Sequence, residues 1–370
     1  MKIAIIVGTR PEIIKFSPII RICERDKIDY FVIHTGQHYS YEMDSIFFKQ
    51  LKLPQPKYNL GIKSSAPHLQ GEHTGKMLIE IEKILLKEMP SIVLVLGDTN
   101  TVLAGALTTK KITTTKSFTG FDIKLGHIEA CIRSHWDEMP EEVNRKIADH
   151  LSDFLYAPTA KSVDNAHREN IDMSKIIITG NTIVDAVHQI SEIAKDVKIL
   201  DDMKLDGQKY LVATMHRQEN VNSEKRFVGI LKGLEKIYKK YRMPIVYPIH
   251  PRTRKIIDKM GIVMPEGVIE TEPLGVLEFF QLQKNACLVL TDSGGVQEET
   301  CILGVPCVTL RDNTERPETL DVGSNILAGA DPDVILSCVD EMLTRPREWK
   351  NPFGDGNAAE KIIQHILKNV

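Results

Sequence analysis

Short runs of apolar residues alternate with longer amphipathic segments along the whole chain. In the first half, the apolar runs lie at residues 3–7, 30–34, 91–96, 124–128 and 154–156. Helix-length segments such as 70–89 and 100–109 separate these runs. Apolar runs of this length are typical of strands buried on both faces, and their alternation with helices predicts an α/β fold with a parallel sheet.

A second alternation of the same kind begins after Asn170. Its apolar runs lie at residues 176–178, 210–213, 245–247, 286–290 and 307–310. Two alternations in a chain of 370 residues predict two domains, the first over 1–170 and the second over 171–356. At the start of the chain, Pro11 suits the first turn of a helix, and Pro18 is expected to kink that helix.

Polar residues follow several predicted strands of the first half. They are Gly8-Thr9-Arg10, Thr35-Gly36-Gln37-His38, Gly97-Asp98-Thr99 and Glu129. Ligands bind beyond the carboxyl ends of the strands in such sheets, so these residues are candidates for a site. Structural alternatives remain open: Arg10 and Lys15 face one cleft or are solvated cations, and Asp98 acts in a site or caps the next helix. Glu141 could equally pair with Arg145 one helical turn on.

In the second half, a Ser293-Gly294-Gly295 turn joins an apolar run to a helical segment. The first amides of a helix are unpaired donors at the positive end of its dipole, and glycines allow a ligand to come close, so this turn predicts a phosphate site. The alternative is a strand-to-helix turn without a ligand. Glu299, one helical turn further on, is well placed to accept hydrogen bonds from a ribose diol. His216 and His250 each follow a predicted strand of the same half.

Composition narrows the class of protein. Lys and Arg number 47 against 50 Asp and Glu, so the net charge of −3 gives no sign of the basic excess that marks nucleic-acid binding. The six cysteines fall at no metal-ligand or redox spacing, and we expect reduced core thiols and no bound metal. The apolar stretches are too short for a signal peptide or a membrane span, which predicts a cytoplasmic protein without membrane partners.

Taken together and in order, the motifs resemble those of the non-hydrolysing UDP-N-acetylglucosamine 2-epimerases. The matching motifs are Gly8-Thr9-Arg10-Pro11-Glu12, Gly97-Asp98-Thr99, His127-Ile128-Glu129-Ala130, Pro140-Glu141-Glu142, Asn144-Arg145, Thr179-Gly180-Asn181-Thr182, Tyr247-Pro248-Ile249-His250, Thr291-Asp292-Ser293-Gly294-Gly295-Val296-Gln297-Glu298-Glu299 and Glu315-Arg316-Pro317-Glu318. The resemblance covers nearly the whole chain. It implies the GT-B architecture, two Rossmann-like domains facing across a cleft, with the C-terminal helix, residues 357–370, returning to the first domain.

The resemblance also implies an activity and its residues. The family forms homodimers that interconvert UDP-GlcNAc and UDP-ManNAc, supplying UDP-ManNAc for surface polysaccharide or glycan synthesis. The implied catalytic residues are Asp98, Glu129, Glu141 and His216. The implied substrate-binding residues are Arg10, Lys15, Asp98, Glu129, Arg145, His216, His250, Phe279, Ser293, Gly294, Gly295, Glu299 and Arg316.

The reaction explains why several acidic residues are needed. The C2 proton of the sugar is not acidic until the C1–O bond to UDP breaks, after which a carboxylate removes it and leaves 2-acetamidoglucal. Re-addition must deliver a proton to the opposite face of C2, which requires acid/base groups on both sides. Asp98, Glu129 and Glu141 supply these groups in an order that stays open. Helix amides at 293–295, Arg10 and protonated His216 would stabilise the departing diphosphate, Phe279 would stack on uracil, and neither metal nor redox cofactor is required.

Two features depart from the family pattern. Ala130-Cys131-Ile132-Arg133 stands where the family commonly has Ala-Gly-Leu-Arg, next to Glu129, and the segment 111–124 is longer than usual. Of the polar set that serves a regulatory UDP-GlcNAc site in bacterial members, only Gln37-His38 remains, which predicts weakened allosteric activation. Three other functions remain as alternatives: a hydrolysing epimerase that releases ManNAc and UDP, a GT-B glycosyltransferase, and a nucleotide-sugar sensor without catalysis.

Overall fold

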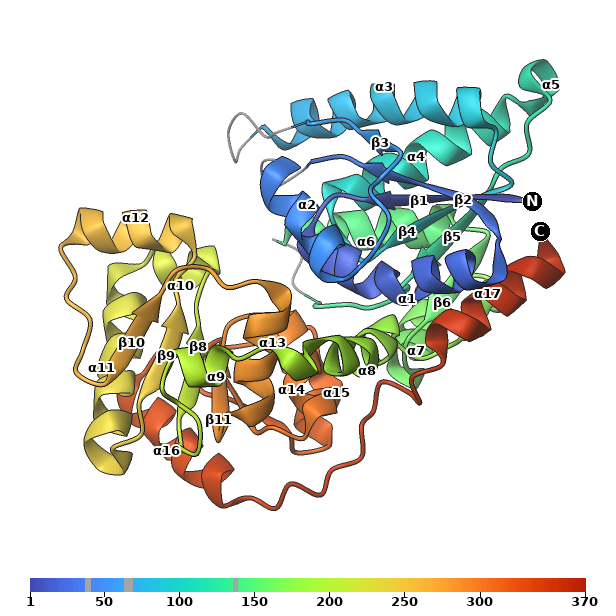
Figure 1. The fold of residues 1–370 in the computed structure, drawn as a ribbon. Coiled ribbons are helices and arrows are strands. Elements are labelled where there is room, and N and C mark those ends of the chain that lie inside the picture. The colour runs from blue at the N-terminus through green and yellow to red at the C-terminus, as the bar shows by residue number, and fades with distance from the viewer. Residues whose placement is uncertain (37–40, 63–68, 136–138) are drawn as a thin grey trace. The chain divides into compact units, whose positions relative to one another are not determined.

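The structure, a computed structural model, describes residues 1–36, 41–62, 69–135 and 139–370 and divides into two compact units (Figure 1). The first unit comprises Met1–Gln189 and Phe353–Val370, and the second comprises Ile190–Pro352. The predicted remnant of a regulatory site, Gln37-His38, lies outside the described residues.

The first unit is built on a seven-stranded parallel sheet in the order β3-β2-β1-β4-β5-β6-β7. The strands are β1 (Lys2–Val7), β2 (Asp29–His34), β3 (Tyr58–Asn59), β4 (Ile92–Leu96), β5 (Lys124–Ile128), β6 (Phe154–Ala157) and β7 (Ile176–Ile178). The chain turns back between β3 and β4, so β1 and β4 become neighbours at the point where the strand order reverses. In sheets of this kind, ligands bind at that point, beyond the carboxyl ends of the strands.

Helices cover both faces of the first sheet, with α3 and α4 on one side and α1 and α17 on the other (Figure 1). The helices of this unit are α1 (Arg10–Asp26), α2 (Tyr41–Gln50), α3 (Gln70–Glu88), α4 (Asn100–Thr114), α5 (Lys116–Thr119), α6 (Pro140–Leu151), α7 (Ala160–Arg168), α8 (Thr182–Ile193), which ends in the second unit, and α17 (Ala358–Asn369). Pro18 lies inside α1, which continues to Asp26. Proline cannot donate to the carbonyl four residues back, and the Ser17 hydroxyl instead donates to Ile14 O at 2.8 Å.

The second unit repeats the arrangement with six parallel strands in the order β10-β9-β8-β11-β12-β13. They are β8 (Leu211–Thr214), β9 (Ile245–Pro248), β10 (Val268–Thr271), β11 (Leu288–Thr291), β12 (Cys307–Thr309) and β13 (Asn325–Leu327). The helices are α9 (Ile199–Asp202), α10 (Gln218–Val221), α11 (Glu224–Tyr241), α12 (Pro251–Met260), α13 (Val276–Asn285), α14 (Gly294–Leu303), α15 (Pro317–Asp321) and α16 (Pro332–Thr344). The reversal point here lies between β8 and β11.

The core of the second unit follows from the two-residue period of its strands. Leu288 and Leu290 pack in the apolar cluster that contains buried residues of α11 and α16. The intervening Val289 packs in a second cluster with Leu282 of α13 and Val296 of α14. Successive side chains of a strand point to opposite faces, so an uninterrupted apolar run supplies both clusters.

The boundary between the units differs from the predicted one. Residues 176–178 were predicted to begin the second domain, but β7 pairs in parallel with β6 as the last strand of the first sheet. The first unit accordingly continues to Gln189, whereas the predicted domain ends at Asn170. An apolar run carries no information about which sheet it joins, and this is why the prediction misplaced the strand.

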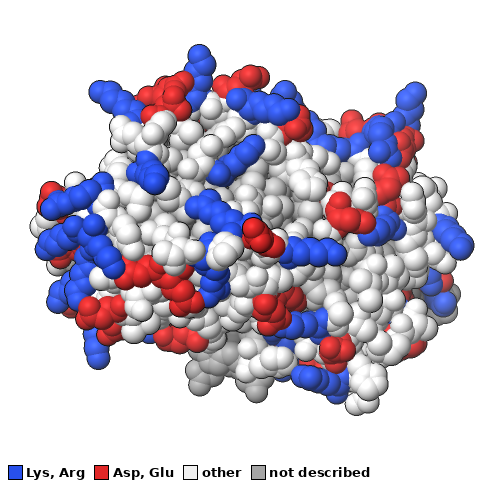
Figure 2. Space-filling model, turned by 90° about the horizontal axis from the view of Figure 1, so that it is seen from below, with Lys and Arg blue, Asp and Glu red and all other residues white. Residues whose placement is uncertain are grey.

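Both signs of charge occur on the surface, and most of the cysteines lie in the core. Lys and Arg side chains are interspersed with Asp and Glu over the face shown in Figure 2, without a field of one sign. Among the described residues, none of the helices has the length and apolar character that crossing a bilayer requires. All six cysteines are free thiols, and five of them are buried.

Candidate active site

In the first unit, two loops meet at the point where the strand order reverses. Gly8 follows β1, and a Cβ atom at this position would lie 2.0 Å from Thr101 Oγ1 and 2.5 Å from Thr35 Oγ1, so only glycine fits. The buried Glu12 connects this loop to the one that follows β4. One of its carboxylate oxygens accepts the Gly8 and Thr9 amides at 2.5 and 2.9 Å, and the other accepts the Thr99 hydroxyl at 2.6 Å. Burial raises the pKa of Glu12 to about 7, although these hydrogen bonds oppose the rise.

Asp98 lies in the loop after β4 and does not cap the next helix. The N-cap of α4 is Thr99, whose hydroxyl accepts the Val102 amide, so the structural alternative for Asp98 is wrong. Its carboxylate instead pairs with Arg145 of α6. The Asp98 side chain is 28% exposed, whereas that of Arg145 is buried, so the guanidinium holds an acid that solvent or a ligand can reach.

Arg145 is held in turn by Glu142, an acidic residue that is not among the predicted site residues. Arg145 Nη1 lies 2.6 Å from Glu142 Oε2, which also accepts the amide and the hydroxyl of Ser134 at 3.1 Å each. Burial favours the neutral acid, but the hydrogen bonds from Ser134 and the charge of Arg145 hold the pKa of Glu142 below its ordinary value. The predicted catalytic residue Glu141 lies in the first turn of the same helix and is half-buried.

Glu129 follows β5, the strand next to β4. Its backbone has φ 61°, the left-handed region that residues with a side chain rarely adopt. Its Oε1 atom lies 2.5 Å from Lys15 Nζ and 2.7 Å from Asn181 Nδ2, and both charged groups are buried. Lys15 is therefore not a solvated cation. Arg10 begins the same helix as Lys15, and its guanidinium lies 4.6 Å from the centre of the Phe47 ring.

Asn181 also fixes the place where the chain re-enters the first unit. Its backbone amide donates to Phe353 O at 2.8 Å. Gly180 has φ 86°, and a Cβ atom there would lie 3.1 Å from the same carbonyl oxygen. The Thr179-Gly180-Asn181-Thr182 motif thus serves a close backbone contact and, through the Asn181 side chain, Glu129.

In the second unit, the predicted phosphate turn has the expected form. β11 ends at Thr291, Ser293 is the N-cap, and α14 begins at Gly294. A Cβ atom on Gly294 would lie 2.6 Å from Glu315 Oε1, so the glycine allows the start of the helix to pack against that acid. The positive end of a ten-residue helix therefore lies at the carboxyl edge of the sheet.

An arginine cluster lies beside this turn. Glu315 pairs with Arg217 at 3.0 Å and with Arg311 at 2.7 Å, and Arg316 pairs with the buried Glu298 at 2.6 Å. Burial alone would raise the pKa of Glu315, but the three guanidinium groups hold it well below its ordinary value. Only Arg316 of these was predicted, although the mixed-charge stretch 311–318 was the signal that could have identified Arg311 and Glu315.

His216 lies at the end of β8, opposite the glycine turn. The buried Asp292 accepts the backbone amides of His216 and Arg217 at 3.0 to 3.1 Å, and it lies 3.1 Å from His216 Nδ1. Burial favours the neutral acid, yet hydrogen bonds and the charge of His216 lower the pKa of Asp292. The His216 side chain remains 45% exposed. A fixed carboxylate thus orients an imidazole that a ligand can reach.

The remaining predicted residues of this unit lie on neighbouring helices. Glu299 of α14 accepts a hydrogen bond from Gln283 of α13 at 2.8 Å. Phe279, also on α13, is half-buried against an apolar cluster. His250 follows β9 and is half-buried. Within the described ranges, no group of three or more His, Cys, Asp and Glu side chains has the geometry to hold a metal ion.

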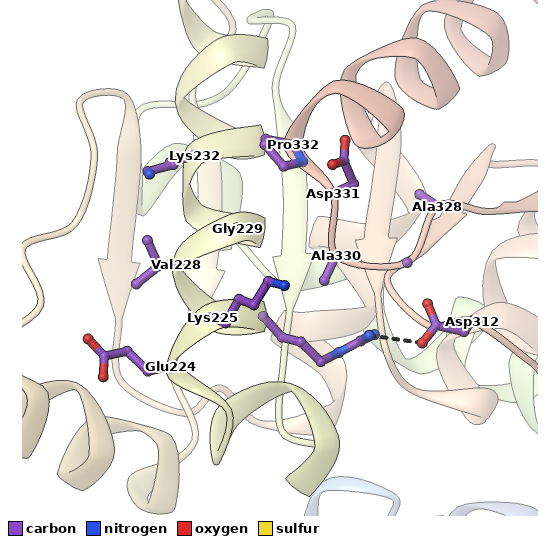
Figure 3. A pocket seen from close by; sticks show the side chains of 12 residues that line it. Glu224, Lys225, Val228, Gly229, Lys232, Asp312, Ala328, Ala330, Asp331 and Pro332 are labelled. Atoms are coloured by element: carbon purple, nitrogen blue, oxygen red, sulfur yellow. Dashed lines mark hydrogen bonds and ion pairs between the residues drawn. The ribbon is translucent and has the colours of Figure 1, made fainter.

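The structure thus brings Lys15, Asp98, Glu129 and Arg145 together at one edge of the first sheet. It brings His216, Ser293, Gly294 and Arg316 together at the corresponding edge of the second sheet. A separate pocket of about 920 Å³ lies at the start of α11 and contains none of the predicted residues (Figure 3). Its polar lining includes Arg226, paired with Asp312 at 2.8 Å.

Known proteins resemble the chain over nearly its whole length. The family model described as UDP-N-acetylglucosamine 2-epimerase matches residues 21–367. The UDP-N-acetylglucosamine 2-epimerase of Methanococcus maripaludis is 52% identical over 99% of this chain and 98% of its own. The UDP-2,3-diacetamido-2,3-dideoxy-D-glucuronate 2-epimerase of Pseudomonas aeruginosa is 38% identical over 100% of both. The crystal structure of the Methanocaldococcus jannaschii UDP-GlcNAc 2-epimerase in complex with UDP-GlcNAc and UDP is 49% identical over 100% of both chains, with a TM-score of 0.90. The prediction of two Rossmann-like domains of the GT-B type is confirmed.

Proposed function

The chain belongs to the UDP-N-acetylglucosamine 2-epimerase family, and from this premise we propose that it interconverts UDP-GlcNAc and UDP-ManNAc. The enzyme is an isomerase of the non-hydrolysing type. It inverts C2 by eliminating UDP and adding it back to the same face of C1, so no free sugar is a product.

The observation that carries this proposal is the pair of carboxylates in the loops that follow the adjacent strands β4 and β5. Gly97 directly precedes Asp98, and the position of a Cβ atom on Gly97 lies 3.7 Å from Glu129 Oε2. Each carboxylate has its own cation, Arg145 for Asp98 and Lys15 for Glu129. Two acids held separately beside one another suit a reaction in which one group removes a proton and another delivers one. A binding protein without catalysis has no need of such a pair.

We assign the diphosphate to the second unit. The start of α14 offers backbone donors and the positive end of a helix dipole, and Arg217 and Arg316 add positive charge beside it. When the C1–O bond breaks, both electrons of that bond leave with UDP. A protonated His216, oriented by Asp292, would stabilise the charge that develops on the leaving phosphate.

The hexose chemistry then falls to the first unit. As the C1–O bond breaks, one carboxylate takes the C2 proton, and the C–H electron pair forms the double bond of 2-acetamidoglucal. In the return step, an acid on the opposite face gives a proton to C2 and UDP adds to C1. Asp98, Glu129 and Glu141 are the candidates for these two acid/base groups. Arg145 and Lys15 hold the carboxylates that they contact in place beside the sugar.

Similarity to named relatives supports UDP-GlcNAc as the substrate. Relatives named UDP-N-acetylglucosamine 2-epimerase are 50% and 52% identical to the chain, against 38% for the relative named for a diacetamido uronate. We further propose, from the family resemblance, that the enzyme is a cytoplasmic homodimer. Light scattering at a mass of twice 41.7 kDa would support the dimer, and a mass of 41.7 kDa would exclude it.

Incubation with UDP-GlcNAc in deuterated water, followed by NMR, tests the activity and its route. We expect UDP-ManNAc carrying deuterium at C2. Inversion with the original hydrogen retained would exclude elimination, and lasting accumulation of free ManNAc would indicate the hydrolysing alternative. Absence of any UDP-ManNAc would contradict the proposed function itself.

A further inference from the structure

A buried histidine lies between the two loops that carry Asp98 and Glu129. His127 is on β5, two residues before Glu129, and its side chain is fully buried. Its Nε2 atom lies 2.8 Å from Gly97 O, the carbonyl that directly precedes Asp98. Its Nδ1 atom lies 2.7 Å from Asp149 Oδ1. The imidazole ring thus links the Gly97 carbonyl to the Asp149 carboxylate.

Asp149 of α6 reaches the second loop as well. Its two oxygens lie 3.0 and 3.1 Å from the amide nitrogen of Cys131, two residues after Glu129. Its Oδ2 atom also pairs with Arg133 Nη1 at 2.7 Å, and the other nitrogens of that guanidinium bind Glu169. A single buried carboxylate thus contacts the backbone after Glu129 directly and the backbone before Asp98 through His127.

The loops held in this way have unusual backbones. Gly97 has φ 83°, Glu129 has φ 61° and Cys131 has φ 65°. A left-handed conformation costs a residue with a side chain roughly 1–2 kcal/mol, so the Glu129 loop persists only where its surroundings over-determine it. Cys131 stands where glycine would adopt this conformation freely. The Asp149 carboxylate on the Cys131 amide is a contact that offsets this cost.

The groups around Asp149 favour its ionised form, which suits a fixed network of Asp149, His127 and Arg133. Burial alone would raise the pKa of Asp149, but the charges and hydrogen bonds of His127 and Arg133 hold it below its ordinary value. The side chain is fully buried, so Asp149 cannot touch a substrate. Its effect on chemistry can only be exerted through the groups it holds.

We propose that Asp149 is a positioning residue, which with His127 fixes the Asp98 and Glu129 carboxylates relative to each other beside the sugar. This inference rests on the proposed epimerase function. A misplacement of about 1 Å in a reacting group can cost roughly 10²-fold in rate. The pair would therefore govern how often the glucal intermediate completes the reaction before it escapes.

The chain offers a matched control at the other end of the same strand. Asp153 accepts the Leu125 amide at 2.8 Å and pairs with Lys110 at 2.6 Å, so it holds the start of β5 as Asp149 holds its end. Neither of these two contacts of Asp153 involves the loops that carry Asp98 and Glu129. Asp153→Asn thus removes a carboxylate that contacts the start of β5 and leaves the bonds of Asp149 and His127 unchanged.

The experiment compares wild type, Asp149→Asn, His127→Asn and Asp153→Asn in two measurements with UDP-GlcNAc. The first measurement determines kcat and KM separately for each variant. The second is the partition ratio, the number of 2-acetamidoglucal molecules released for each UDP-ManNAc formed. This ratio does not depend on the fraction of molecules that are folded, so a merely structural role would not change it.

We expect Asp149→Asn and His127→Asn to lower kcat by about 10²-fold with little change in KM, and to raise the partition ratio several-fold. Asp153→Asn should keep the wild-type ratio. A lower kcat with an unchanged ratio, or wild-type values in both variants, would overturn the positioning role. If Asp149→Asn does not fold, His127→Asn decides the question, and if neither folds the pair is a folding requirement and the proposal fails. A wild-type enzyme that forms no UDP-ManNAc would instead refute the proposed function.

Discussion

At the scale of single residues, the acids at the carboxyl edge of the first sheet differ in what holds them. Glu129 has the ammonium of Lys15, and Asp98 has the guanidinium of Arg145. Glu12 is held by two backbone amides and the Thr99 hydroxyl. These neutral donors do not compensate fully for the loss of water, and the pKa of Glu12 rises to about 7.

This difference predicts a pH dependence of stability. With a pKa raised from its ordinary 4.5 to about 7, Glu12 keeps a proton in the folded chain that the unfolded chain releases. The free energy of unfolding should therefore fall as pH rises from about 4.5 to 7, by up to ~1.4 kcal/mol per pH unit. Glu12→Gln should lack this component. Urea unfolding midpoints between pH 5 and 8 would measure it.

The exposed Glu24, on the same helix, provides the control. Glu24→Gln should keep the pH dependence of the wild type, because its carboxylate lies at the surface. Parallel pH profiles for wild type and Glu12→Gln would show that Glu12 ionises normally in the folded chain.

At the scale of elements, α1 shows how one side chain adapts a helix to an unsuitable residue. Pro18 cannot donate to the Ile14 carbonyl, and the buried Ser17 supplies a hydroxyl in its place. A buried carbonyl without a partner costs about 1–3 kcal/mol. The helix that carries Lys15 therefore depends on the Ser17-Pro18 pair acting together.

A double-mutant cycle tests this dependence. Ser17→Ala alone should destabilise the first unit by about 1 kcal/mol, because the Ile14 carbonyl loses its donor. In a Pro18→Ala background the backbone amide of residue 18 restores that donor, and the same serine substitution should cost much less. The free energy of each step follows from urea unfolding. Equal costs in both backgrounds would mean that the Ser17 hydroxyl does not replace the missing amide.

The sequence predicted the buried strands well because both of their faces are covered and their apolar runs are continuous. It missed β3, β10 and β13, which are short or lie at sheet edges with exposed positions. For the site, strand ends identified Asp98 and Glu129, but pairs such as Lys15 with Glu129 join residues 114 apart, and no local pattern shows them. The left-handed backbone at Glu129 could not be predicted either, because the residue at this position is not glycine.

At the scale of the whole molecule, the two units share one strand order, and each has its reversal point between its first and fourth strands. This shared topology places the candidate residues of both units at equivalent positions, after β1, β4 and β5 in one and after β8 and β11 in the other. The chain completes the first unit only on its return, when α17 packs against α1 (Figure 1). Asp185 of α8 fixes that return by accepting the Ala358 and Ala359 amides at 3.2 and 3.0 Å.

Loss of this acceptor should loosen the last helix. Asp185→Ala leaves the first amides of α17 without their carboxylate, a loss of about 1–2 kcal/mol for a helix cap. We expect amide exchange in 358–369 to become roughly 5- to 30-fold faster, as measured by mass spectrometry. Glu192→Ala changes an exposed residue of α8, the helix that carries Asp185, and should leave amide exchange in 358–369 unaltered. Unchanged exchange in Asp185→Ala would show that α17 is held by its apolar face alone.

The re-entry of the chain has a further consequence. Phe353 O accepts a hydrogen bond from the Asn181 amide, and the Asn181 side chain donates one to Glu129. Two hydrogen bonds through Asn181 thus connect the returning segment to a proposed acid/base group. A premature stop codon after Pro352 would leave every predicted site residue in the translated product. Such a truncated enzyme should nevertheless be inactive. It would lack the Phe353 carbonyl that fixes Asn181, and Asn181 would then no longer orient Glu129.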